Sequence, residues 1–323
     1  MCSYKCSTGF LVLMLLIISL PKNLYTQVTR EVGIVIEVTG KCWLSRANAS
    51  ERFQIKGSTT LIAGDTLKTE AGSKVKILLW NGDQRKTIFQ NMTYVVPGIE
   101  KKDKKQIGIA DAAFGLLKEK YKEVTSAVVE TKSHEAAIRG LGDESFFLIF
   151  PRNEYVEKNA LEFQWTPAGA GVNYTFRLKE NGVSVLEKET KESKLMMDYS
   201  YKPRTRYIWE IEAKNAGGKS SIDSAGFWIQ SDEEKAMLKK ELDSFLAMEG
   251  LLSSSQRLLM TPIIYDKWNM YSQSIREYGK LLNEPGIEKD EIVSFIRSEY
   301  NKMGLPGNEA SFAKYLRLMN IQF

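Results

Sequence analysis

The chain has one histidine, His134, and this side chain is the most common choice for acid-base catalysis and for metal binding. A nucleophilic triad also needs a positioned nucleophile and an acidic residue that orients the histidine. A metal site recruits several His, Cys or carboxylate ligands at helical or hairpin spacing. Neither arrangement surrounds His134 in VVETKSHEAAIRGLGDE. We therefore expect an exposed or hydrogen-bonded histidine, and no catalytic residue, metal or cofactor.

Cysteine chemistry is limited to one candidate, Cys42. Cys2 and Cys6 precede an apolar N-terminal run, so they are removed with it or stay on the cytoplasmic side. A single exported cysteine cannot close an intramolecular disulfide, so stability must come from packed cores. Cys42 shares a predicted strand face with Leu44. We expect a small buried hydrophobic side chain there rather than a reactive thiol.

The sequence lacks the motifs of common enzymes. It contains no G-x-x-x-x-G-K-[ST], no G-x-G-x-x-G after a predicted strand, no H-E-x-x-H and no G-x-S-x-G. A pair of carboxylates could still cleave a glycosidic bond, because such pairs are recognised only in space. We expect a protein that is not an enzyme and keep a glycan-active envelope enzyme as an alternative.

Residues 1–26 have the features of a signal peptide. Lys5 precedes the apolar run from Phe10 to Leu20, which is shorter than the roughly 20 residues that a membrane-spanning helix needs. We predict cleavage near Thr26 and export to the periplasm or the cell envelope. The small residues that a signal peptidase prefers are missing before Thr26. Membrane association through a retained N-terminal segment is therefore an alternative.

The charge balance argues against nucleic acid as a partner. The chain has a net charge of +5, and loss of residues 1–26 removes two lysines and no acidic residue. A nucleic-acid-binding surface needs basic clusters on one face. The only dense basic run is Lys101-Lys102-Asp103-Lys104-Lys105, which we interpret as a solvated linker.

Residues 27–149 are expected to form a β-domain with an inserted helix near 107–124. Turn signals are followed by strand patterns, which cover residues 31–44 with a break at Gly40, then 59–63, 66–69, 74–80 and 86–96. This makes about seven short strands. Between 107 and 124 the apolar residues recur at intervals of three and four, which is typical of an amphipathic helix.

This pattern resembles the FecR domain of bacterial envelope proteins. The similar residues include Gly64-Asp65-Thr66-Leu67-Lys68-Thr69, then Ala71-Gly72-Ser73 and an apolar strand that ends in a glycine turn. Gly40-Lys41-Cys42-Trp43-Leu44 resembles the first strand of the family. Thr131, Ala137, Arg139 and Gly140 match a second patch, after which Leu141-Gly142 replaces the usual Thr and aromatic residue. We interpret Arg139 as a structural arginine that binds strand-end carbonyls.

Residues 150–230 carry aromatic residues at strand spacing and resemble a fibronectin type III-like β-sandwich. The similar features are an early Trp165, a late Tyr207-Ile208-Trp209-Glu210-Ile211 strand preceded by Lys202-Pro203, and evenly spaced turns. An aromatic row at period two is typical of a sandwich core. We therefore do not expect Trp165 or Trp209 to bind a ligand.

Residues 231–323 are expected to be helical. Ser231 and Glu234 have the spacing of a capping box, a helical hairpin is predicted to turn near Asn269, and Asn308 is expected to cap the last helix. Tyr265, Tyr271, Ser274 and Tyr278 are similar to tetratricopeptide-repeat positions, whereas Pro262 departs from that pattern. A helical bundle that docks on the preceding modules or on a partner explains the same residues.

These observations predict a multidomain, mainly β protein with an all-α C-terminal region. The expected function is a non-catalytic exported envelope protein that binds or scaffolds an envelope protein or a cell-wall polysaccharide. The sequence alone does not identify the residues of its binding site. The FecR resemblance implies an alternative, a component that senses a signal in the envelope. Such regulators need a cytoplasmic segment ahead of the membrane helix, and only nine residues precede the apolar run here.

Overall fold

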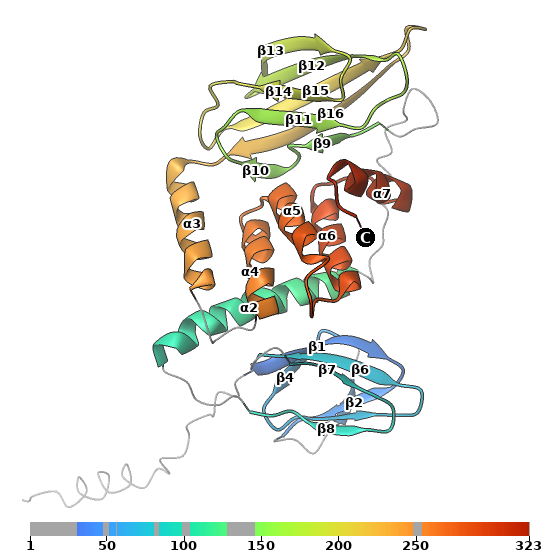
Figure 1. Cartoon of the computed structure of the whole chain (residues 1–323), viewed down its shortest axis with the longest axis vertical. Coiled ribbons are helices and arrows are strands. Elements are labelled where there is room, and N and C mark those ends of the chain that lie inside the picture. Colours follow the sequence, from blue (N-terminus) through green and yellow to red (C-terminus); the bar gives the residue numbers. More distant parts are fainter. Residues whose placement is uncertain are drawn as a thin grey trace, which may run out of the picture.

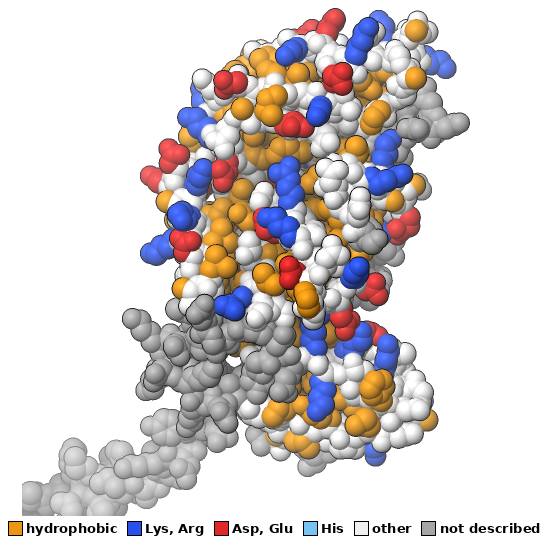
Figure 2. All heavy atoms as spheres, in the orientation of Figure 1, with side chains coloured by type: hydrophobic (Ala, Val, Ile, Leu, Met, Phe, Trp, Pro, Cys, Tyr) orange, Lys and Arg blue, Asp and Glu red, His pale blue; other side chains and the backbone are white. Residues whose placement is uncertain are grey.

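The computed structural model describes residues 31–47, 52–55, 57–80, 84–98, 104–127, 146–247 and 254–322. Antiparallel β-sheets form the N-terminal and central parts, and helices form the C-terminal part, as predicted. The helices make a middle layer with one β module on each side of it (Figure 1). Basic and acidic side chains are interspersed over the face of the described residues that Figure 2 shows. The predicted signal peptide, residues 1–26, lies outside the described residues.

The N-terminal module consists of two four-stranded sheets with a shared core. Their strand orders are β4-β1-β6-β7 and β3-β2-β5-β8. The strands are β1 (Glu31–Thr39), β2 (Cys42–Ser45), β3 (Arg52–Gln54), β4 (Thr60–Ile62), β5 (Thr66–Thr69), β6 (Lys74–Leu79), β7 (Gln84–Ile88) and β8 (Thr93–Val95). Val75, Ile77 and Leu79 alternate along β6, so they face the opposite sheet and form part of this core.

The second face of β6 is also buried, which the alternation alone does not predict. Leu78 and Trp80 belong to the core of the helical layer. The Trp80 ring stacks on Phe114 of helix α2 (Lys104–Ala127) with ring centroids 5.2 Å apart. The N-terminal module is therefore joined to the helices by a packed apolar contact.

Helix α2 spans the region where periodicity predicts a helix, but it belongs to the helical layer rather than to the β-domain. Its apolar stripe, Ala113, Leu117 and Tyr121, shares one core with the C-terminal helices. Helices α4 (Ser254–Lys267) and α6 (Lys289–Lys302), from the end of the chain, pack against α2. Figure 1 shows α2 crossing beneath the ends of these helices.

The central module is a β-sandwich of a five-stranded and a three-stranded sheet. Their strand orders are β10-β16-β15-β12-β13 and β14-β11-β9, with β10 parallel to β16. The strands are β9 (Leu148–Phe150), β10 (Glu154–Val156), β11 (Leu161–Trp165), β12 (Asn173–Glu180), β13 (Val183–Thr190), β14 (Lys194–Met197), β15 (Arg206–Lys214) and β16 (Ser220–Ile229). Phe146 and Leu148 are already in the sandwich core, so this module begins before residue 150.

Five helices follow the sandwich. They are α3 (Asp232–Leu246), α4 (Ser254–Lys267), α5 (Tyr271–Leu281), α6 (Lys289–Lys302) and α7 (Glu309–Leu318). The capping box of Ser231 and Glu234 is present, and the Asn308 side chain accepts a hydrogen bond from Ser311 N–H at 2.8 Å. Helices α4 and α5 form the predicted hairpin, which turns at Asn269 with a φ of 54°.

Polar contacts fix the sandwich to the helices. The Arg152 guanidinium pairs with Asp223 at 3.1 Å and also donates to the Met303 carbonyl at the end of α6. The Tyr155 N–H of β10 donates to the Asn269 carbonyl at 2.9 Å. On the other side of the layer, Arg85 of β7 pairs with Glu291 of α6.

Among the described residues, no helix has the length and hydrophobicity to cross a membrane.

Candidate functional site

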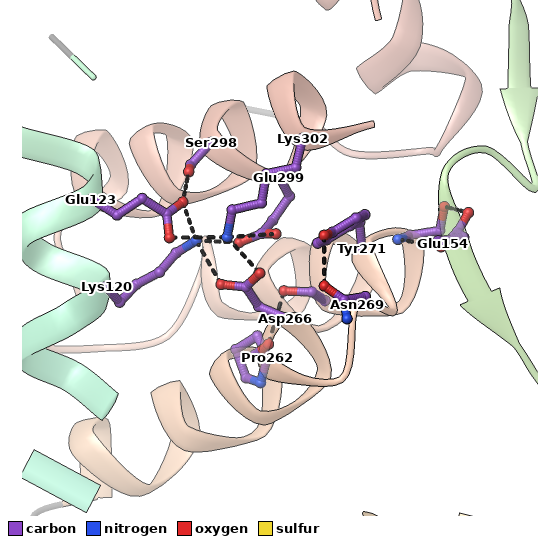
Figure 3. A network of polar contacts seen from close by, with 12 residues as sticks. Lys120, Glu123, Glu154, Pro262, Asp266, Asn269, Tyr271, Ser298, Glu299 and Lys302 are labelled. Carbon is purple, nitrogen blue, oxygen red and sulfur yellow. Dashed lines mark hydrogen bonds and ion pairs between the residues drawn. The ribbon is translucent and has the colours of Figure 1, made fainter. Parts of the chain in front are cut away.

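Charged residues meet in two places of the helical layer, and the first is a network between α2, α4 and α6. The Lys120 ammonium of α2 bonds Glu123 Oε1 at 3.2 Å, Asp266 Oδ2 at 3.1 Å and a carboxylate oxygen of Glu299. Lys302 bonds Asp266 Oδ1 at 2.6 Å and Glu123 Oε2 at 2.9 Å. Figure 3 shows the three acids around the two ammonium groups.

Burial dominates the electrostatics of this network. The side chains of Lys120 and Glu299 are 1% and 0% exposed. Burial raises the pKa of Glu299 to about 8, although both lysines oppose the shift. Burial also disfavours the charge on Asp266, but the two lysines outweigh it and hold the pKa of Asp266 below its ordinary value. The positive and negative charges of the network therefore nearly cancel inside the protein.

The three carboxylates of this network are also close enough to hold a cation. Ligand oxygens of Glu123, Asp266 and Glu299 lie within 4.8 Å of one another. The Lys120 ammonium bonds all three, so the chain itself supplies the positive charge that a metal ion would bring. These residues come from three helices that are distant in sequence. We therefore assign the network to holding α2 against α4 and α6.

The second place is a cleft between the sandwich and the helical layer. Its volume is about 460 Å³, which is within the range of small-ligand sites. The lining combines aromatic rings, methionines, amides and charged groups. It consists of Phe150, Glu154, Tyr155, Val156, Glu157, Asn159, Ala160, Leu161, Glu162, Met196, Tyr265, Met270, Gln273 and Arg276. Strands of the sandwich and helices α4 and α5 both contribute, so the cleft exists only in the docked arrangement.

Glu154 is one of the residues that line the cleft, and it caps helix α5. Its carboxylate accepts hydrogen bonds from Ser272 N–H at 2.9 Å, from the Ser272 hydroxyl at 2.7 Å and from Arg152 N–H at 3.2 Å. Burial raises the pKa of Glu154 to about 7, while these donors and the nearby Arg276 oppose the shift. The residue preceding α5, Met270, has no capping side chain of its own. A strand of the sandwich therefore supplies the cap.

Arg276 is the cation of the cleft. Its guanidinium carbon lies 5.4 Å from the centroid of the Phe150 ring. In the part of the chain that the structure describes, no carboxylate lies within ion-pair distance of Arg276, although Glu154 is near enough to feel its charge. The residue is exposed and lines the cleft. Its donors are thus available to a ligand.

Some of the other polar groups of the cleft are already engaged within the chain. Glu157 accepts a hydrogen bond from the Lys235 ammonium of α3 at 2.7 Å. Gln273 donates to Glu277 at 3.1 Å, which leaves its amide oxygen as an acceptor. Burial and the charges of Glu277 and Glu157 raise the pKa of Tyr265. The Tyr265 hydroxyl therefore stays protonated at neutral pH.

The structure locates most of the residues that the sequence singles out. Cys42 is fully buried, and burial raises the pKa of its thiol, as expected for a hydrophobic core residue. Asp65 is buried in its turn, where it accepts Ile62 N–H and pairs with Arg46. Trp165 and Trp209 are fully buried in the sandwich core. None of these four residues lines the cleft.

His134 and the patch of Thr131, Ala137, Arg139 and Gly140 lie outside the described residues. The linker lysines Lys101 and Lys102 also lie outside them, and Lys104 begins α2. The predictions for these residues remain predictions.

Sequence reasoning missed the residues of both polar sites. Lys120 and Glu299 each occupy a position within the apolar stripe of an amphipathic helix, next to Tyr121 and Tyr300 respectively. A charged residue in such a stripe signals a buried ionic contact. Glu154 and Arg276 carry no comparable signal, because glutamate at the start of a strand and arginine within a helix are both ordinary in a sequence.

Comparison with known proteins adds no relative. No protein-family model matches this sequence, and no curated protein matches it.

Proposed function

We propose that this protein is a non-catalytic exported envelope protein that binds a cell-wall glycan or an envelope protein through the cleft. The observation that carries the proposal is the composition of the cleft, in which aromatic faces, amides and one available guanidinium surround about 460 Å³ of space. Binding sites typically combine an apolar lining with a few oriented polar groups. Two hydrogen bonds between β10 and the start of α5 join the two walls of the cleft.

Binding accounts for the carboxylates of the cleft better than glycan cleavage does. A glycosidase needs one accessible protonated acid and a second carboxylate across the scissile bond. Glu154 has the raised pKa of such an acid, but it is only 1% exposed and all its hydrogen bonds go to the chain itself. Glu157 is tied to Lys235. The acids thus support structure rather than turnover.

The envelope location rests on the signal-peptide features and on the FecR resemblance. The two four-stranded sheets of the N-terminal module are compatible with that family, and the strand orders of the sandwich are compatible with a fibronectin type III-like module. Modules of these kinds serve as binding platforms or spacers. A sensing component of the envelope is the second candidate, in which the same cleft would receive the signal molecule.

The proposal can be tested by obstructing the cleft with one exposed substitution. Ala160→Trp places an indole in the lining, and Ala216→Trp is the matched control in the β15–β16 turn, at the far end of that hairpin from β10. We expect the mature protein and the Ala216→Trp variant to bind immobilised envelope extract or purified peptidoglycan. The Ala160→Trp variant should stay in the unbound fraction. Equal retention of both variants would exclude the cleft as the site.

The same samples distinguish binding from catalysis. Release of soluble fragments from purified peptidoglycan by the wild-type protein, lost in Glu154→Gln, would overturn the non-catalytic proposal in favour of a glycan-active enzyme. We expect no such release.

A further inference from the structure

Arg276 differs from the other arginines that hold this protein together. Arg85 pairs with Glu291, Arg152 with Asp223, and Arg177 with three glutamates of neighbouring strands. Arg276 has an aromatic ring on one side and no acid at ion-pair distance among the described residues. An arginine that is exposed within a cleft, and oriented by a ring, is arranged for an anionic group from outside.

The shape of the guanidinium indicates which anion. Its planar fork of N–H donors matches the two oxygens of a carboxylate, and the pair is stronger when the arginine is already oriented. Contact with the Phe150 ring restricts the Arg276 side chain at the cleft wall. The cleft therefore favours a carboxylate over a neutral polar group at this position.

The remaining walls fit a sugar ring. Tyr155, whose ring also stacks on Trp228, and Tyr265 line the cleft with aromatic rings. The exposed Met196 adds polarisable apolar surface. The Gln273 amide oxygen and the Tyr265 hydroxyl can meet hydroxyl groups of a ligand. A saccharide presents apolar ring faces and hydroxyl edges, which correspond to these two kinds of wall.

An extended peptide fits the cleft less well. Peptides that add to a sheet edge need free backbone groups on the edge strand. Strand β10 is the edge that faces the helices, and its Tyr155 N–H already donates to the Asn269 carbonyl. The α4–α5 turn therefore occupies the position that a bound peptide strand would take.

The acids at the rim limit the charge of the ligand. Glu157 and the exposed Glu162 line the same cleft as Arg276. A polyanion with a carboxylate on every sugar would meet these acids and be repelled. An isolated carboxylate between neutral sugars avoids them.

We propose that the cleft binds a cell-wall saccharide that carries one carboxylate between neutral groups, and that Arg276 is the partner of this carboxylate. The inference rests on the proposed function, because it assigns the ligand class of the same cleft. An amino-sugar disaccharide with a lactyl ether, as in bacterial peptidoglycan, has this chemistry.

The test uses calorimetric titration of the full mature chain with two probes that differ only at the carboxylate, which is ionised in one and esterified in the other. One probe is N-acetylglucosaminyl-N-acetylmuramic acid, and the other is the methyl ester of its carboxylate. We expect the acid to bind wild-type protein at least about tenfold more tightly than the ester. Arg276→Gln should remove this difference, and Arg276→Lys should restore part of it.

Arg52→Gln is the matched control, because Arg52 also lies over an aromatic ring, that of Trp43, but in the N-terminal module. It should keep the preference of the wild type for the acid. Unchanged melting temperatures would show that both variants fold. Equal binding of acid and ester by the wild type would overturn the inference and leave the binding function standing. If neither probe binds while Ala160→Trp still abolishes retention on envelope material, the saccharide assignment is wrong but the cleft is not.

Discussion

The Glu154 carboxylate of β10 accepts hydrogen bonds from both the N–H and the hydroxyl of Ser272, a residue 118 positions later in the chain. The acid comes from the sandwich and the two donors come from the first turn of α5. The contact fixes the strand to the helix, and Glu154 also lines the cleft. It links the assembly of the modules to the site that we propose for binding.

Removal of this cap should destabilise the protein. We expect Glu154→Ala to lower the free energy of unfolding by about 2 kcal/mol, because it removes a helix cap and leaves buried N–H groups unpaired. Glu154→Gln keeps one acceptor oxygen for Ser272 N–H and should cost less than the alanine variant. Urea denaturation of the three proteins measures the difference. Equal loss in both variants would mean that hydrogen bonding to Ser272 is not what stabilises the contact.

Stability should fall as pH rises from about 4.5 to about 8. Glu154 and Glu299 have pKa values of about 7 and about 8 in the folded protein, against 4.5 for an ordinary glutamate. The folded state therefore binds more protons than the unfolded state in this window, so each pH step favours unfolding. For Glu154 alone the effect is about 3 kcal/mol.

Thermal denaturation between pH 5 and pH 8 tests this dependence. The double variant Glu154→Gln/Glu299→Gln should show a flatter profile than the wild type. Asp266 and Glu37, whose pKa values are lowered, lose their stabilising charge only at more acidic pH and do not mask the effect. A wild-type stability that rises with pH in this window would contradict the prediction.

The contribution of the buried network to the free energy of unfolding should depend on the balance between its positive and negative charges. Lys120→Met leaves the three acids of the network with Lys302 as their one remaining cation among the described residues, and we expect a loss of about 3–5 kcal/mol. Glu299→Leu removes the acid as well, so the double variant should lose much less than the sum of the two single variants. A double-mutant cycle by chemical denaturation gives the coupling. Additive losses would show that Lys120 and Glu299 act independently.

The contact between the N-terminal module and α2 should depend on Trp80. This side chain is 3% exposed and stacks on Phe114, so Trp80→Ala should cost about 3–5 kcal/mol and expose the junction to proteolysis. Trp43→Ala is the control, because Trp43 is only half-buried and its indole bonds Glu70 at the surface. Similar losses in both variants would argue against a special role for the junction.

Local elements of this fold were accessible from the sequence. Turn residues mark short strands, and the helix periods mark α2 and the C-terminal helices, because these signals act between residues a few positions apart. The capping box of Ser231 and Glu234 is such a local pattern, and it is present. The alternation along β6 also predicts its core face.

The sequence carries less information about which helices and strands pack together. The sequence places α2 within the N-terminal β-domain because the two are adjacent in the chain, yet α2 packs with helices that begin more than a hundred residues later. The second face of β6 becomes buried only because α2 covers it. Such contacts depend on complementary surfaces of distant elements, which no local pattern specifies.

The sequence by itself determined that the chain has β modules followed by helices, that Cys42 is a core residue, and that common enzyme motifs are absent. Lys120 and Glu299 were not identified from the sequence, although each lies in the apolar stripe of its helix. Only the tertiary structure decided that they are partners of each other across 179 residues, and that Glu154 caps α5 beside Arg276. The physical reason is that pairing of buried charges and the shape of a cleft depend on how separate elements dock.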